Sequence, residues 1–286
     1  MKLLVKVNDQ ELSKYLKFTN SFLYGLKNYS IDYYEITIDE IKELLNKYPN
    51  IELFISINKN IFNKDLDDLK NKLIELSKLN IKGILFYDLS ILSIVKSLNL
   101  NINLVYHQTH MVTNYNICDF YNYLGVKYAY LSSEITTQEM IEISDKTKME
   151  LMVYFIGHQI ISHSKRKLVS NFYKHINKEN NNKLNIIKER NKDTKYYIEE
   201  NELGTNILTG DILNGSYAFR ELEDKISYGI LDNNYIDEDI FIKVLEIYSK
   251  YLNKEIDDNK FINNVEKLIG NYDGFFYTKT IYKVKK

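Results

Sequence analysis

The sequence predicts an α/β protein with the (β/α)8 architecture of a TIM-like barrel, either as a full ring or as an incomplete one. Short apolar runs alternate with longer amphipathic segments seven times without a break between residues 3 and 156. This alternation predicts parallel strands, because each helix returns the chain to the same edge of the sheet. The regular spacing of the apolar runs favours a closed barrel over an open, doubly wound sheet.

The predicted strands are apolar runs that are too short for independent helices. In the first 156 residues they are 3–7, 21–26, 52–57, 81–87, 102–106, 127–131 and 151–156. The last run stops at Gly157 and delivers His158 and Gln159 into the following loop. Such a strand end is a common place for reactive side chains in α/β proteins.

The predicted helices lie between these runs, where apolar residues recur at spacings of three and four. They are 9–16, 38–45, 66–79, 91–98, 117–123 and 137–145. Thr37 is the expected N-cap of the second helix. Ser164 is expected to begin a further helix, which is rich in Lys and Arg.

The pattern changes after Tyr173. Residues 162–192 hold nine Lys or Arg and two Glu, a local net charge of about +7. Residues 178–183 are expected to form a loop, and 195–200 with 206–209 an antiparallel hairpin around Asn201 and Gly204. The eighth strand is expected at 227–231, followed by a helix at 238–252 and a tail.

The sequence therefore predicts one barrel domain with an insertion. Residues 1–161 would supply strands one to seven, and residues 162–224 a basic helix and a hairpin between strands seven and eight. Residues 225–286 would supply the last strand, the C-terminal helix and the tail.

Charge and cysteine content exclude several classes of site. The chain holds 38 Lys or Arg and 39 Asp or Glu, so any RNA contact requires a local basic patch. The single cysteine, Cys118, excludes a disulfide framework, a cysteine-ligated zinc site and a [4Fe–4S] cluster held by four cysteines of this chain. The N-terminus does not look like a signal peptide, and no apolar stretch approaches the roughly 20 residues of a membrane-spanning helix. We therefore expect a cytoplasmic protein with no membrane partner.

Polar side chains are expected to gather where the parallel strands end, which is the face that carries the active site in barrel enzymes. These residues are Asn58, Asp88, His107, Gln108, His110, Asn114, Glu134, His158, Gln159 and Asp232. Four of the five histidines follow strands five and seven, and imidazole is the usual general acid or base near neutral pH.

Several interpretations of these residues stay open. Asp88, Ser132 and Ser133 are equally suited to cap helices. A divalent metal would be held by His107 or His110 with His158 and Glu134. There is no GxSxG, GxGxxG or Walker sequence, and Cys118 lies in an apolar helical segment, as a buried filler would.

The basic residues after Ser164 suggest an anion site. Lys165, Arg166 and Lys167 in a first helical turn oppose the helix dipole, unless a phosphate or carboxylate binds there. A solvated basic helix face is the alternative.

The segment GHQIISHSKRKL, residues 157–168, resembles the signature of the collagenase-like peptidase family U32. The resemblance continues through SINKNIFNKDLDDL, GILFYDLSIL, HQTHMVTN, LSSEITTQEM, YYIEENELGTNIL and GFFYTKTIYKVKK, in the family's order. It implies a barrel-like fold. By motif match it carries over Gly157, His158, Gln159, Ser164, Arg166 and Leu168, together with Asn114, Glu134 and Glu200.

The family name implies peptide hydrolysis, whereas other members hydroxylate a quinone precursor or RNA bases, including the wobble uridine of tRNA with prephenate as a contributor. Many members use a cysteine-ligated iron–sulfur cluster. This chain resembles the short, cysteine-poor members that accompany a longer relative.

Three functional hypotheses follow from these observations. The first is tRNA hydroxylation, as a catalytic or accessory subunit, with tRNA, a longer U32 paralogue and a carboxylate such as prephenate as partners. Here His158, Glu134 and His107 would be catalytic, and His158 and Glu134 would open onto one cavity. The substrate or anion would be held by Gln159, Ser164, Arg166, Asn114, Asn58 and Lys165. The second is a peptidase, metal-dependent through the histidines, and the third is a non-catalytic scaffold.

Overall fold

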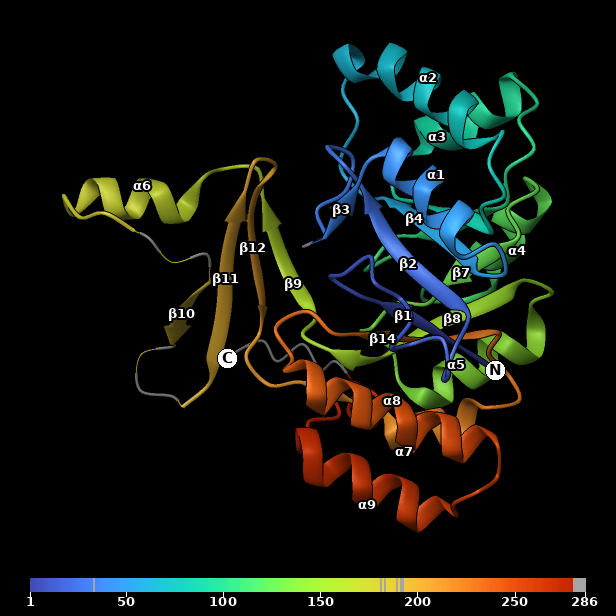
Figure 1. Cartoon of the computed structure of the whole chain (residues 1–286), viewed down its shortest axis with the longest axis vertical. Helices are drawn as coiled ribbons and strands as arrows, with labels where there is room; N and C mark the ends of the chain where they lie inside the picture. Colours follow the sequence, from blue (N-terminus) through green and yellow to red (C-terminus); the bar gives the residue numbers. More distant parts are fainter. Residues whose placement is uncertain (33, 181, 183, 189, 191–192, 280–286) are drawn as a thin grey trace, which may run out of the picture.

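The computed structural model describes residues 1–32, 34–180, 182, 184–188, 190 and 193–279. Within these residues, eight parallel strands form a ring in the order β1-β14-β8-β7-β6-β5-β4-β2, which closes where β1 pairs with β2 (Figure 1). The strands are β1 (Lys2–Lys6), β2 (Ser21–Leu26), β4 (Glu52–Ile57), β5 (Gly83–Phe86), β6 (Leu104–His107), β7 (Tyr128–Tyr130), β8 (Glu150–Gly157) and β14 (Tyr228–Asp232). The predicted fold class and all eight predicted strands are confirmed, and the ring is complete.

Helices cover the outside of the ring (Figure 1). They are α1 (Ile38–Lys47), α2 (Leu66–Leu76), α3 (Leu89–Ser97), α4 (Tyr115–Tyr123), α5 (Thr137–Lys146), α7 (Ser216–Leu222), α8 (Glu238–Leu252) and α9 (Asp258–Ile269), with a 3-10 turn η1 (Asn63–Asp65) before α2. Thr37 caps α1 by accepting from the backbone N–H of Glu40, as predicted. No described helix combines the length and the apolar character that a membrane crossing requires.

The helix predicted at residues 9–16 is wrong, because this segment forms hydrogen-bonded turns. The side chain of Asp9 accepts from the backbone N–H of Glu11 and also binds Lys14. Local bonds from an aspartate to nearby backbone groups compete with helix formation. Helices α7 and α9 and the short strands β3 (Glu35–Ile36) and β13 (Leu213–Asn214) were not predicted.

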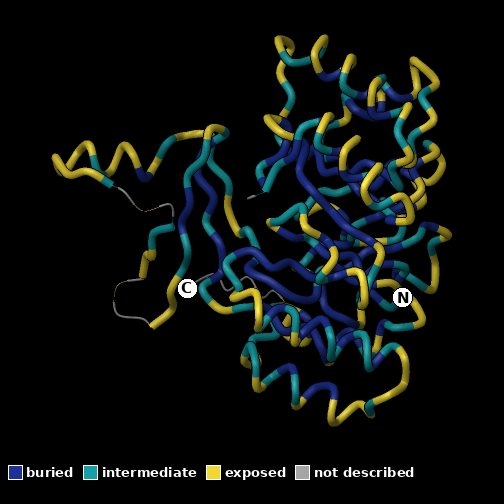
Figure 2. The backbone as a smooth tube through the Cα atoms, viewed as in Figure 1, coloured by how far each residue is buried: buried dark blue, intermediate teal, exposed yellow. Residues whose placement is uncertain are grey.

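A second, four-stranded sheet stands beside the barrel and is antiparallel throughout (Figure 1). Its strands are β9 (Ile160–Ser164), β10 (Leu184–Lys188), β11 (Lys195–Asn201) and β12 (Gly204–Thr209), in the order β10-β11-β12-β9, and it carries helix α6 (Leu168–His175). The predicted hairpin is confirmed as β11 and β12. Figure 2 shows the barrel strands buried and much of α6 and β10 exposed.

The helix predicted to begin at Ser164 is wrong at its start. Ser162 to Ser164 belong to β9 and pair with β12, so helix α6 begins only at Leu168, after Lys167. The three basic residues therefore lie between a strand and a helix rather than in a first helical turn. Lys183, Glu189, Lys192 and residues 280–286, which belong to the predicted basic segment and tail, lie outside the described residues.

The interior of the barrel is packed with apolar side chains that point inward from its strands. They are Leu4, Leu23, Phe54, Leu85, Val105, Tyr128, Met152, Tyr228 and Ile230. Phe54 meets Tyr128 and Tyr228 edge to face, with ring centroids 5.8 Å and 5.2 Å apart. A larger apolar cluster lies between the strands and the helices. Because apolar side chains fill the interior of the ring, its polar cavity is confined to one end.

Candidate functional site: a polar cavity at the carboxyl ends of the barrel strands

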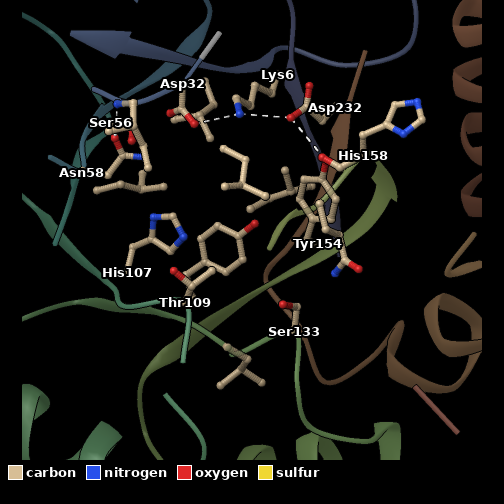
Figure 3. Close-up of a pocket in the computed structure, with 18 residues that line it drawn as sticks. Lys6, Asp32, Ser56, Asn58, His107, Thr109, Ser133, Tyr154, His158 and Asp232 are labelled. Atoms are coloured by element: carbon tan, nitrogen blue, oxygen red, sulfur yellow. Dashed lines mark hydrogen bonds and ion pairs between the residues drawn. The ribbon is translucent and has the colours of Figure 1, made fainter. Parts of the chain in front are cut away.

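A cavity of about 100 Å³ opens at the carboxyl ends of the barrel strands (Figure 3). Side chains alternate along a strand with a period of two, so inward residues recur two positions further along. The layer above the apolar interior is therefore formed by Lys6, Ser56, His107, Tyr130, Tyr154 and Asp232, all of which line the cavity. The alternation that fills the barrel with apolar groups thus ends in a polar layer.

Lys6 lies at the centre of the polar layer. Its Nζ atom is 2.9 Å from Oδ1 of Asp32 and 3.0 Å from Oδ2 of Asp232 (Figure 3). The second contact follows from strand register, because Lys6 of β1 pairs directly with Asp232 of β14. Burial acts to lower the pKa of Lys6, but the two carboxylates outweigh it and raise that pKa well above its usual value. One cation between two carboxylates leaves this group with a net charge of −1.

Asp32 follows β2 and is fixed by a buried loop. Burial acts to raise its pKa, but the Lys6 ammonium and the Ser30 hydroxyl hold the pKa below its usual range. Ser30 Oγ lies 2.9 Å from Asp32 Oδ2. Asn58, expected to bind substrate, lines the cavity but also accepts the backbone N–H of Ile31 at 2.8 Å. Asn58 therefore orders the loop that carries Asp32.

His107 stacks on Tyr130, with ring centroids 4.1 Å apart and planes 8° from parallel. The two residues pair directly between β6 and β7, which places both rings on the inner face. Burial lowers the pKa of His107 to about 4, so the ring is neutral at neutral pH. Among the described residues, its buried Nδ1 atom has no hydrogen-bond partner, and neither has the buried Oγ of Ser56. Buried polar atoms without a partner are uncommon, and both of these belong to residues that line the cavity.

His158 lies on the opposite side of the Lys6 group from His107 (Figure 3). It lines the cavity, is 4% exposed, and its Nδ1 lies 2.8 Å from the carbonyl oxygen of Thr209. A carbonyl only accepts, so Nδ1 carries the proton and Nε2 is the acceptor. Burial lowers the pKa of His158, which keeps the ring neutral. Its contact with Thr209 ties the second sheet to the barrel.

Gly157 is required where β8 ends. Its φ is 135°, and a Cβ built on it would come within 2.1 Å of the hydroxyl of Tyr154. That hydroxyl lies 3.3 Å from Oδ2 of Asp232. The glycine of the family signature thus leaves room for a tyrosine that contacts the central carboxylate.

Glu134 does not line this cavity. It is exposed and contacts His110, whose Nδ1 lies 2.8 Å from Glu134 Oε1. Gln159 does line the cavity. Asn114 caps α4 by accepting from the backbone N–H of Ile117, and Asp88 caps α3 by accepting from the N–H of Ser90.

Three residues expected to hold an anion, Ser164, Lys165 and Arg166, lie beyond the barrel, at the end of β9 and directly after it. The hydroxyl of Ser164 accepts from the backbone N–H of Arg166, whose side chain is exposed. Lys165 Nζ lies 3.3 Å from the centroid of the Phe62 ring. Glu200 accepts from the backbone N–H groups of Val169 and Ser170 at the start of α6. A carboxylate beside Arg166 would therefore sit outside the barrel cavity.

The side chains bear on two cofactor classes, a divalent metal ion and an iron–sulfur cluster. Among the described residues, no three His, Cys, Asp or Glu gather as a metal site, and His110 with Glu134 lies apart from His158. Cys118 is buried in α4, and burial raises its thiol pKa to about 12. One inert cysteine does not fit an iron–sulfur cluster, which needs four ligands.

Sequence reasoning missed Lys6, Asp32, Ser56, Tyr130 and Tyr154. Four of them could have been found from the alternation of side chains along a strand. Lys6, Ser56, Tyr130 and Tyr154 each lie two residues after an apolar residue that points into the barrel. Asp32 gave no such signal, because it follows its strand in a loop.

One family model and two curated relatives match the chain. The model described as peptidase family U32 matches residues 18–280. The tRNA hydroxylation protein P2 of Bacillus subtilis (strain 168) is 22% identical over 289 residues, which cover 92% of this chain and 92% of that protein. The tRNA hydroxylation protein P1 of the same organism is 25% identical over 150 residues, or 52% of this chain and 35% of that protein.

Solved structures share the barrel. The structure of the U32 peptidase Mk0906 has a TM-score of 0.50 and 11% sequence identity, and the match covers 81% of this chain and 92% of that chain. At that identity the likeness concerns the fold alone.

Proposed function

The chain belongs to peptidase family U32, and on that premise we propose that it takes part in hydroxylation of tRNA at the wobble uridine, with the barrel cavity as the pocket for the base. Two relatives are named for tRNA hydroxylation, and one of them is similar along nearly the whole chain. A nucleobase must leave its stack before a protein can surround it, and a barrel mouth offers such an enclosed pocket.

The observation that carries this proposal is a pair of buried, unpaired polar atoms, Ser56 Oγ and His107 Nδ1, in two residues that line the cavity. Buried polar groups normally have partners, so their isolation points to a ligand with hydrogen-bonding edges. The volume of about 100 Å³ is several times the roughly 10–15 Å³ that one buried water needs.

The charge of the cavity favours an uncharged ligand over a carboxylate. Lys6 is already paired with two carboxylates, and both His107 and His158 have lowered pKa values that keep them neutral. A second anion would meet a net negative charge in a partly dehydrated space. A uracil ring is planar and neutral and carries both donors and acceptors.

We propose that this chain is the subunit that holds the base, and that a longer relative supplies the redox chemistry. Cys118 is the chain's one cysteine and is buried within α4, so an iron–sulfur cluster would have to belong to the partner. The role of this chain is then to bind, orient and shield the base.

The test is mass spectrometry of tRNA nucleosides from a strain that lacks the gene. The expected result is loss of the 5-hydroxyuridine-derived nucleosides, with recovery when the wild-type gene is restored. An unchanged level in the deletion strain would overturn the proposal. The family description makes peptide hydrolysis the second candidate, and cleavage of a peptide library that His158→Ala abolishes would favour it.

A further inference from the structure

A second cavity, of about 330 Å³, lies between the barrel rim and strand β9 of the outer sheet. It adjoins the first cavity, because Asn58, His107 and Thr109 line both. Its other polar groups include Lys59, His110 and His163. Resting on the proposed role in tRNA hydroxylation, we infer that this cavity binds the ribose–phosphate unit of the RNA whose base enters the barrel cavity.

The charge of the second cavity differs from that of the first. The first holds Asp32 and Asp232, whereas the described residues that line the second include the cation Lys59 and no Asp or Glu. The His107 ring, which lines both, is neutral. Two carboxylates contact these groups without lining the cavity. Asp65 lies 3.7 Å from Lys59, and Glu134 binds His110. An anionic group is therefore favoured in the second cavity and disfavoured in the first.

Lys59 is placed to meet the phosphate. Its side chain is 14% exposed, and its ammonium lies 4.1 Å from the centroid of the Tyr29 ring. The cation–π contact with this ring holds the ammonium of Lys59 near the cavity. Asp65 is too distant to form a hydrogen bond with it. Its N–H groups are thus available for a phosphate oxygen.

His163 is placed to read the ribose. Asn206 Nδ2 lies 2.9 Å from the carbonyl oxygen of Ile31 and 2.9 Å from Oε1 of Glu199, which fixes the amide with Oδ1 facing His163. Oδ1 lies 2.7 Å from His163 Nδ1, so that nitrogen carries the proton. Nε2 is then an acceptor in the neutral ring. It suits a 2′-hydroxyl donor, the group that distinguishes RNA from DNA.

The surface beyond the cavity continues the positive charge. Lys165 follows β9 and lies over Phe62, which belongs to the segment after Lys59. Both residues lie close in the chain to residues that line the cavity, Lys165 after His163 and Phe62 after Asn60. The exposed Arg166 lies next to Lys165 in the chain, so a nucleic acid backbone that leaves the cavity meets further cations.

The test is binding of a labelled anticodon stem-loop RNA to the full chain, measured by fluorescence anisotropy over a series of salt concentrations. Lys59→Met keeps the apolar stem over Tyr29 but removes the charge. We expect roughly threefold to tenfold weaker binding and a salt slope that is lower by about one. The matched control is Lys72→Met, because Lys72 lies 5.9 Å from the same Tyr29 ring and does not line the cavity.

The second arm compares RNA with DNA of the same sequence. His163→Asn keeps a donor toward Asn206 and removes the acceptor Nε2. We expect the wild-type chain to prefer RNA, and His163→Asn to lose that preference while its DNA binding is unchanged. Wild-type affinity and salt slope in Lys59→Met, equal binding of RNA and DNA by the wild-type chain, or no RNA binding at all would overturn the inference.

The two proposals fail in different ways. If the deletion strain keeps its hydroxylated nucleosides but RNA binding depends on Lys59, the second cavity serves another RNA and the proposed function fails alone. If the nucleosides disappear on deletion but the Lys59→Met gene restores them and binds RNA like wild type, the cavity inference fails alone. Loss of prephenate binding in Lys59→Met, with RNA binding intact, would assign the cavity to a small carboxylate instead.

Discussion

The Nζ atom of Lys6 lies 3.0 Å from Oδ2 of Asp232, across two strands that pair in register at the closure of the barrel. Both residues line the cavity at the carboxyl ends of the strands. The strands that close the barrel also deliver the charges at its centre.

Lys6→Met should destabilise the chain strongly, because it leaves Asp32 and Asp232 buried without their cation. We expect a loss of about 3–5 kcal/mol in the free energy of unfolding, measured by urea denaturation. Lys2→Met is the matched control on the same strand. Lys2 is 54% exposed and binds Glu52, so its loss should cost about 1 kcal/mol or less. Equal losses in the two variants would contradict a buried network.

His107 should make a contribution to stability that is lost in mild acid. Its pKa is about 4 in the folded chain, against about 6.5 for an unfolded histidine. Between these values this histidine binds more protons in the unfolded chain, so its contribution to the free energy of unfolding decreases as the pH falls from about 6.5 toward 4, by up to about 3 kcal/mol. The stabilisation is fully present above about pH 6.5.

The variant that isolates this effect is His107→Phe, which keeps an aromatic ring against Tyr130 and does not titrate. Urea midpoints near neutral pH and in mild acid should differ less for this variant than for the wild-type chain. His158 has a lowered pKa as well and acts in the same direction. Burial raises the pKa of Glu35 to about 7 and also raises that of Glu199, and these carboxyls act in the opposite direction in both proteins. The same dependence in both proteins would show that His107 is not buried in its neutral form.

Ser56→Ala should affect function rather than folding. Its hydroxyl is buried without a partner in the described structure, so removing it should leave stability unchanged or slightly higher. We expect reduced recovery of hydroxylated nucleosides in the deletion strain. Ser216→Ala is the matched control, because Ser216 is equally buried and unpaired but lies in α7, away from the cavity. Full recovery with Ser56→Ala would count against base binding at this hydroxyl.

Gly157→Ala should cost more than Gly125→Ala, although both glycines have positive φ. At Gly157 the new Cβ would lie 2.1 Å from Tyr154 Oη, whereas nothing lies within 4 Å at Gly125. We expect losses of about 3 kcal/mol and about 1 kcal/mol, respectively, by urea denaturation. Similar losses would mean that Tyr154 can move aside without cost.

The barrel was predictable because each of its strands is a short apolar run between polar turns, and such runs identify buried parallel strands without knowledge of their neighbours. The start of α6 was not predictable from the sequence. Residues 162–164 form a strand only because they pair with β12, some forty residues later in the chain. A local cap signal at Ser164 was overridden by that distant partner.

The candidate site was predictable where strand geometry fixes it. Asp232 and His107 end barrel strands, so their place at one rim followed from parallel pairing. From the sequence alone, Lys6 would be expected at the surface. Only the pairing of β1 with β14, which closes the ring, places it opposite Asp232. Glu134 lies in the loop after β7, where strand register no longer controls direction, and it binds His110 rather than lining the barrel cavity.

The pairing of β1 with β14 sets the order in which the molecule is completed. Lys6 is synthesised long before Asp232, so the ion pair between them cannot form until the chain as far as Asp232 has been made. Contacts between such distant segments make folding slow, and until then the carboxyl-end cavity has no final wall. A translation product that stops before Tyr228 would therefore carry many of the strands and an incomplete cavity.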